Sequence, residues 1–94
     1  MWFIAAGTIE LEITDSATLK DKRQVVKSLL DRVRARFNVA AAEVEQLDSR
    51  RFATLALCAV ANDQAVVHSI LEKAIDVVES EPRATVLNYQ IEML

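Results

Sequence analysis

Hydrophobic and polar residues are arranged with two different periods along this chain. Residues 2–13 alternate in character, and a period of two over this length predicts a β-strand. Residues 39–45, 52–61 and 85–93 predict three further strands. The second strand is rich in alanine, whereas the third is apolar on both of its sides.

Two other segments carry apolar residues at the three- and four-residue spacing of an amphipathic helix. The first should begin near Leu19, because Thr18 and Asp21 form a variant of the capping box that satisfies free backbone N–H groups. The second should follow an Asn62-Asp63 cap. It should end before Pro82, because proline disfavours helix in the residue that precedes it.

The order of these elements, β-α-β-β-α-β, restricts the fold. Each β-α-β half requires a right-handed crossover, and the six-residue, mostly polar segment 46–51 suits a hairpin between the halves. We therefore expect one α+β domain over residues 1–94, a ferredoxin-like plait. It should have a four-stranded antiparallel sheet in the order 4-1-3-2, with two helices on one face. A different α+β arrangement of the same elements is the main alternative.

Length and composition agree with a small globular domain. The chain has 94 residues, of which 52% are hydrophobic, and no apolar run is long enough to cross a bilayer. Its apolar start lacks a basic leader, which favours a first strand over a signal peptide. The single Cys58 cannot form an internal disulfide, so we expect a cytoplasmic protein that does not contact membranes.

The net charge of −3 conceals a strong segregation of charge. Residues 1–19 carry −3, and residues 52–94 carry −4. Between them, residues 20–51 combine nine Lys or Arg with five acids, which gives +4. A polyanionic partner therefore remains possible despite the acidic average.

The basic residues of this middle region should meet at one end of the domain. On a helical wheel, four of them fall within one narrow sector of the first helix, and the predicted topology places the hairpin loop beside the start of that helix. Free N–H groups at the helix start would add to an anion site there. The alternative is a solvated flank whose long side chains cover the edge of the core. The candidate RNA- or anion-binding residues are Lys20, Lys22, Arg23, Lys27, Arg34, Arg50 and Arg51.

A second candidate surface is the side of the sheet that faces away from the helices. The residues expected there are unusually apolar, which favours a contact face and, most simply, a homodimer. A shifted register or cover from a chain terminus would remove this surface. The candidate interface residues are Trp2, Ile4, Phe52, Cys58 and Val60.

The sequence offers little for catalysis or metal binding. It contains one histidine, His68, one cysteine and one glycine, so no metal-ligand set and no glycine-rich phosphate loop can be assembled. His68 and Cys58 should lie on opposite faces of the sheet, which rules against a thiol–base pair. We therefore expect no catalytic residues, no cofactor and no metal.

Several strings resemble the YlxP-like family of small bacterial proteins. They are Leu19-Lys20-Asp21-Lys22-Arg23, the run Val25–Leu30, Arg36-Phe37-Asn38-Val39 and the closing Tyr89-Gln90-Ile91-Glu92. The resemblance covers essentially the whole chain, with Thr18 in place of the serine cap expected in the family.

This resemblance implies a ferredoxin-like plait without enzymatic activity. Genes of the family tend to neighbour those for ribosome-binding factor A and translation initiation factors. The resemblance thus implies a cytoplasmic role in ribosome maturation or translation, with ribosomal RNA or the ribosome as partner. The family's most distinctive residues correspond here to Lys20, Lys22, Arg23 and Lys27.

Overall fold

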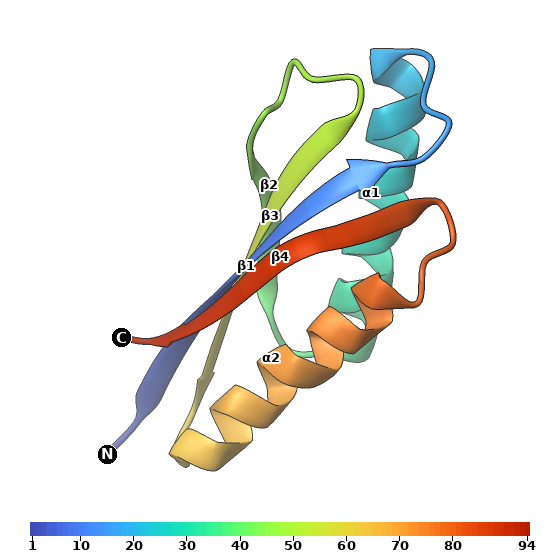
Figure 1. The fold of residues 1–94 in the computed structure, drawn as a ribbon. Helices are drawn as coiled ribbons and strands as arrows, with labels where there is room; N and C mark the ends of the chain where they lie inside the picture. Colours follow the sequence, from blue (N-terminus) through green and yellow to red (C-terminus); the bar gives the residue numbers. More distant parts are fainter.

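A computed structural model describes all residues 1–94, and its elements follow one another in the predicted order (Figure 1). Each lies within a few residues of the range expected from the sequence. The strands are β1 (Phe3–Ile13), β2 (Ala40–Glu45), β3 (Phe52–Ala61) and β4 (Ala84–Met93), and the helices are α1 (Leu19–Arg36) and α2 (Gln64–Glu79).

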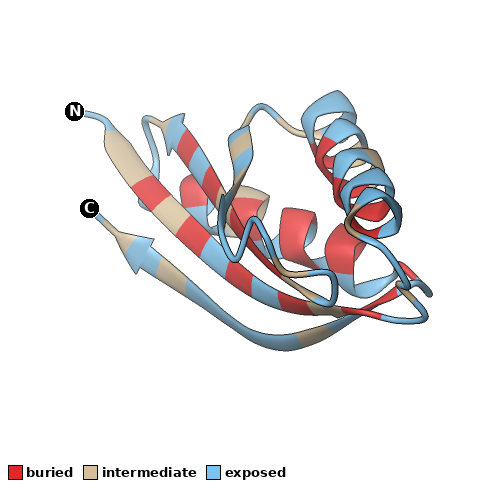
Figure 2. Cartoon of the chain, turned by 90° about the horizontal axis from the view of Figure 1, so that it is seen from above, coloured by how far each residue is buried: buried red, intermediate tan, exposed pale blue.

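The four strands form one antiparallel sheet in the order β2-β3-β1-β4, which is the predicted order read from the other edge. Both helices lie on one face of this sheet, so the chain is a ferredoxin-like α+β domain (Figure 2). No helix combines the length and the apolar character needed to cross a membrane.

The core lies between the sheet and the helices. Alternate side chains of the central strands point into it, and Ile9, Leu11 and Leu55 are fully buried. They pack with Leu29 of α1 and Leu71 of α2, which are equally buried. Burying each side chain of this size stabilises the fold by about 2 kcal/mol. The same alternation turns the other half of each central strand toward the uncovered face of the sheet.

Side-chain caps explain where the helices begin. The Thr18 hydroxyl accepts a hydrogen bond from the Asp21 N–H at 3.1 Å, and the Asp21 carboxylate accepts one from the Thr18 N–H at 3.2 Å. This capping box confirms the predicted start of α1. The Asp63 carboxylate likewise accepts a hydrogen bond from the Ala65 N–H at 2.9 Å and begins α2.

The molecule is elongated, about 46 Å in its longest dimension. The start of α1 and the β2–β3 loop lie together at one end, whereas both chain termini lie at the other (Figure 1). The crossovers therefore place the candidate basic residues of the loop and of the start of α1 at the opposite end of the domain from the chain termini.

Candidate anion-binding end

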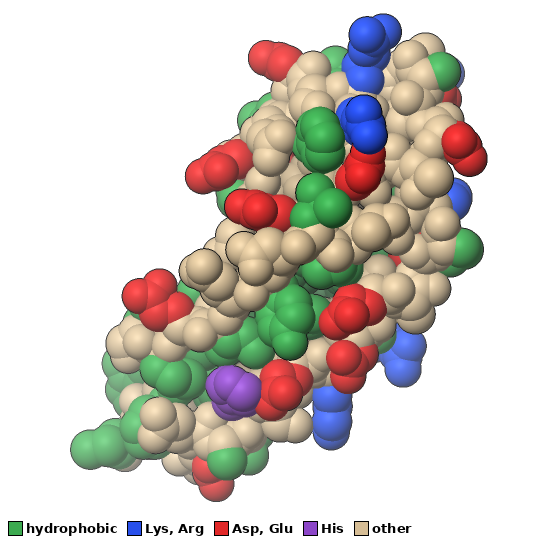
Figure 3. All heavy atoms as spheres, viewed as in Figure 1, with side chains coloured by type: hydrophobic (Ala, Val, Ile, Leu, Met, Phe, Trp, Pro, Cys, Tyr) green, Lys and Arg blue, Asp and Glu red, His purple; other side chains and the backbone are tan.

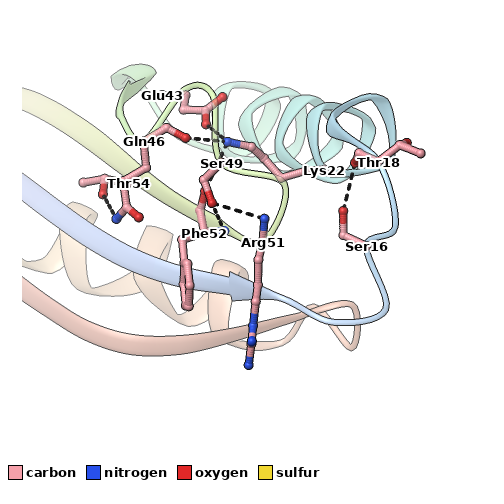
Figure 4. Close-up of polar contacts among 9 residues, drawn as sticks. All are labelled: Ser16, Thr18, Lys22, Glu43, Gln46, Ser49, Arg51, Phe52 and Thr54. Atoms are coloured by element: carbon pink, nitrogen blue, oxygen red, sulfur yellow. Dashed lines mark hydrogen bonds and ion pairs between the residues drawn. The ribbon is translucent and has the colours of Figure 1, made fainter.

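The β2–β3 loop is fastened to α1 by a single lysine. The ammonium group of Lys22 donates hydrogen bonds to the carbonyl oxygens of Gln46 at 2.9 Å and Phe52 at 3.1 Å (Figure 4). These two residues flank the loop, so the predicted convergence of the loop with the start of α1 is present in the structure.

Lys22 itself is not available to an external anion. Its side chain is completely buried, and its ammonium lies 2.6 Å from the carboxylate of Glu43 on β2. With three protein oxygens around one ammonium, all three of its donors are used. The expectation that Lys22 is an exposed anion ligand is therefore corrected: it is a buried connection between α1 and the hairpin.

The spacing of residues in α1 contains a signal for this burial. Lys22 precedes the buried residues Val26, Leu29 and Val33 by four, seven and eleven positions, so it lies in the centre of the core-facing stripe. The long apolar part of the lysine side chain crosses this stripe, and the charge reaches Glu43 beyond it. No residue near Lys22 in the sequence indicates that Glu43 is its partner.

Two other predicted ligands are engaged by neighbouring groups. Arg51 forms a salt bridge with Glu12 of β1, and its guanidinium lies 5.3 Å from the centre of the Phe52 ring. Arg34 donates to the Ala41 carbonyl of β2. Both side chains remain accessible, 67% for Arg51 and 47% for Arg34, but these contacts reduce the positive charge that they offer to a ligand.

The remaining predicted cations are also exposed, and no hydrogen bond joins them to the sheet. Lys27 pairs with Asp31 at 2.8 Å, but its side chain remains 79% accessible. Lys20 and Arg23 lie on the same side of α1, Arg50 lies in the loop fastened by Lys22, and none of these three forms a salt bridge. Figure 3 shows basic side chains at the end of the molecule where α1 begins, with acidic ones close by.

The free N–H groups expected at the start of α1 are partly used by the protein itself. The Asp21 carboxylate accepts from the N–H groups of Ala17 and Thr18, and the Thr18 hydroxyl accepts from the Asp21 N–H. The protein therefore supplies its own anion at this helix end. Any external anion must be held mainly by the exposed lysine and arginine side chains.

Glu81 has a buried carboxylate whose ionic contacts the sequence did not indicate. It precedes β4, its side chain is only 4% exposed, and it contacts Arg32 of α1 at 2.5 Å and Arg83 at 2.8 Å. Hydrogen bonds from Arg83 lower the pKa of Glu81 to about 2, from an ordinary value of 4.5. Because Glu81 lies 49 residues from Arg32 in the sequence, only the fold brings them together.

The sequence profile of the family described as "Protein of unknown function (DUF503)" matches residues 4–91, nearly the whole chain. The chain belongs to this family. Within it, the DUF503 chain is 30% identical over 79 residues to the uncharacterized protein YlxP of Bacillus subtilis (strain 168), a match that covers 84% of this chain and 86% of that protein.

Among solved structures, the DUF503 chain is similar to a REP-associated tyrosine transposase bound to a REP hairpin. The TM-score is 0.44 and the sequence identity 11%; the match covers 98% of this chain but only 56% of the transposase. A similarity of this strength carries no argument about function.

The open face of the DUF503 sheet is apolar at only one of its ends. Trp2 and Val60 are 67% and 53% exposed, Cys58 is exposed, and Ile4 is half-buried. Phe52 lies at the other end of β3 beneath Arg51. The predicted interface residues therefore do not form one continuous surface, and the apolar part lies near the chain termini.

The DUF503 chain contains no group of three or more His, Cys, Asp or Glu residues placed to hold a metal ion. His68 pairs with Glu72 on α2, with its Nδ1 atom 2.6 Å from the carboxylate. A cavity of about 380 Å³ lies between the β1–α1 connection and Pro82-Arg83, and most of the residues that line it are polar. Of the hydroxyl groups in this lining, that of Ser16 donates a hydrogen bond to the Thr18 carbonyl at 3.1 Å.

Proposed function

We propose that this protein is a non-catalytic, cytoplasmic accessory protein that binds RNA in ribosome maturation or translation. The phosphate-binding residues in this proposal are Lys20, Arg23 and Lys27 of α1, together with Arg50 of the β2–β3 loop. The observation that carries the proposal is that these four exposed cations come from two separate segments, which are fastened together at one end of the domain.

The salt-bridge partners and the solvent exposure of these cations support the choice of these four residues. Lys20, Arg23 and Arg50 have no salt-bridge partner within the protein, and the Lys27 ammonium stays largely in solvent. Exposed lysine and arginine side chains bind phosphates by displacing condensed counterions, which requires neither a deep pocket nor a particular base. Lys22 contributes indirectly, because it holds the loop that carries Arg50.

The mode of binding should depend on charge rather than on base stacking. Modules that read single-stranded RNA on a sheet need exposed aromatic rings on the central strands. Here the Phe52 ring is half-buried beneath Arg51, and the neighbouring outward residue, Thr54, is only 2% exposed. We therefore expect little sequence preference.

A pair of charge-reversal variants tests the proposal. Lys20→Glu combined with Arg23→Glu should weaken binding to a ribosomal RNA fragment by at least about tenfold, because two phosphate contacts are lost and repulsion is added. Fluorescence anisotropy with a labelled fragment measures this change.

The matched control is Arg36→Glu combined with Lys73→Glu. Both residues are exposed, form no salt bridge and border one cavity near the C-terminal end of α1. Arg36 lies about 24 Å along the helix from Lys20. The control makes the same change in net charge and should leave binding within about twofold. An equal loss in both variants would show that net charge alone matters and would contradict a site at this end.

The second candidate function is that of a protein-interaction or homodimerisation module without a nucleic-acid role. The exposed cluster of Trp2, Cys58 and Val60 on the open sheet face favours it. A homodimer through this face should be linked through Cys58 under mild oxidation and weakened by Trp2→Ser. A chain that remains unlinked, with a mass that Trp2→Ser does not alter, contradicts it.

A further inference from the structure

The two edges of the sheet are built differently. The β2 edge is short, with six residues, and its register with β3 is interrupted between Glu43 and Glu45. Glu43 points to the helix side, where it meets Lys22, and Arg34 donates to the Ala41 carbonyl. Short length, inward-pointing charge and irregular pairing are known protections against strand addition.

The β4 edge lacks most of these protections. It has ten residues, its only charged residue is Glu92, and it contains no proline or lysine. The ladder with β1 shifts once, between Glu10 and Leu11, and leaves Leu87 unpaired. From Asn88 to Met93 the ladder is regular, so six consecutive residues present an ordered outer edge. Figure 2 shows this strand at the rim of the sheet, exposed along most of its length.

Apolar side chains accompany this uncovered edge. Tyr89 pairs with Ile9 and Ile91 pairs with Gly7, which places both on the helix side of the sheet. Tyr89 is nevertheless 50% exposed, and Ile91 is only half-buried. Next to them, Met93 lines a groove together with His68 and Glu72 of α2. α2 therefore does not reach far enough to cover the outer part of β4.

We infer that the β4 edge pairs antiparallel with the β4 edge of a second copy of this chain, which joins two sheets into one of eight strands. A two-fold axis at Gln90 would place Tyr89 opposite Ile91 of the second copy on the helix side. On the open side it would place Asn88 opposite Glu92, so that an amide donor meets the only charge of the strand. No like charges are opposed in this register, and aromatic–aliphatic pairs of this kind stabilise antiparallel strands.

The inference goes beyond RNA binding and leaves that site free. Pairing at β4 involves neither the start of α1 nor the β2–β3 loop, because β4 lies at the opposite edge of the sheet from β2. It also leaves Cys58 and Val60 of β3 on the open face uncovered. A result that contradicts pairing at β4 would therefore leave the proposed RNA-binding site unaffected.

Sedimentation velocity over a range of concentrations tests the pairing. The 10.5 kDa chain should shift to twice its mass as concentration rises. Tyr89→Lys should raise the dissociation constant by at least about tenfold, because it removes a central aromatic contact and places a charge at the edge. The matched control is Val44→Lys on the β2 edge, since Val44 is 45% exposed, and it should not change the dissociation constant. A monomer at every concentration, or equal effects of the two variants, would overturn the inference.

Cysteine cross-linking tests the register without relying on a destabilising variant. Opposed residues in antiparallel strands have Cα atoms about 4.5–5.5 Å apart, which is within the range of a disulfide. In a Cys58→Ser background, Gln90→Cys should give a covalent dimer under mild oxidation, whereas Val44→Cys should not. Equal cross-linking of both variants would overturn the inference, as would dimers of the unaltered chain linked through Cys58.

Discussion

At the scale of single residues, Lys22 has a structural role, whereas nearby cations in the sequence are exposed and form no salt bridge. Lys20 and Arg23 lie on either side of it in the sequence, yet both point to solvent whereas Lys22 is fully buried. A buried ammonium is tolerated only when its charge and its donors are satisfied, and here Glu43 and two carbonyl oxygens satisfy them. Lys22 thus belongs to the framework of the basic end rather than to its binding surface.

This role predicts a large loss of stability in the Lys22→Met variant. The substitution leaves the mostly buried carboxylate of Glu43 and two carbonyl oxygens without their donor, which should cost about 3 kcal/mol of unfolding free energy. Urea denaturation measures the loss. Lys20→Met is the matched control and should change stability by less than about 0.5 kcal/mol. Similar small effects of both substitutions would contradict a structural role for Lys22.

At this scale the sequence predicted where the cations gather but not which of them form internal contacts. It found that the cations of α1 and the hairpin loop converge, because topology alone determines which ends of the elements meet. It missed the burial of Lys22, although the spacing to Val26, Leu29 and Val33 indicated it. It could not find the pairing of Arg51 with Glu12, because that contact depends on the register of β1 with β3.

At the scale of elements, two polar connections hold α1 in place. Lys22 fastens the N-terminal half of the helix to the hairpin, and Arg32 fastens its C-terminal half to Glu81, ahead of β4. Arg83 contacts the same carboxylate and lies 3.4 Å from the Ser28 hydroxyl on α1. The helix that carries the basic residues is therefore attached at two points, to the β2–β3 hairpin and to the segment that precedes β4.

The lowered pKa of Glu81 makes the second connection sensitive to acid. A carboxylate whose pKa is lower in the folded state stabilises the fold fully above the ordinary value of 4.5, and this contribution disappears as the pH falls through about 2. At pH 7, Glu81→Gln should therefore cost about 2 kcal/mol, an amount that allows for the partial exposure of both arginines. The cost should shrink at pH 3.

Denaturation by urea at pH 7, 4.5 and 3 measures this dependence. Glu79→Gln is the control, because Glu79 is exposed and forms no salt bridge. If the stability difference between Glu81→Gln and the unaltered protein were the same at all three pH values, the ionised carboxylate would not be the source of the stabilisation.

The elements themselves were predictable from the sequence. Strict alternation identified β1, and the capping box identified the start of α1, because both signals are local. The unpaired Leu87 and the partners of Glu81 were not predictable, since each depends on residues that are distant in the sequence. The sequence predicted an uninterrupted strand over residues 85–93, but the register shift removes Leu87 from the ladder with β1.

At the scale of the whole molecule, the fold separates three surfaces. The basic end lies where α1 begins, the apolar part of the open face lies near the termini, and the β4 edge runs along one side (Figure 1). The net charge of −3 describes none of them, because residues 20–51 carry +4 whereas residues 1–19 and 52–94 carry −3 and −4. Each surface can therefore be altered without changing the other two.

The salt dependence of binding to ribosomal RNA tests the central claim most directly. Contacts between the four exposed cations and about four phosphates predict that the logarithm of the binding constant falls against the logarithm of salt concentration with a slope of about −3 to −3.5. The Lys20→Glu, Arg23→Glu variant should have a slope that is shallower by about 1.5 to 2, because two phosphate contacts are lost. Binding that does not change with salt, or the same slope in both proteins, would contradict an RNA-binding site at the basic end.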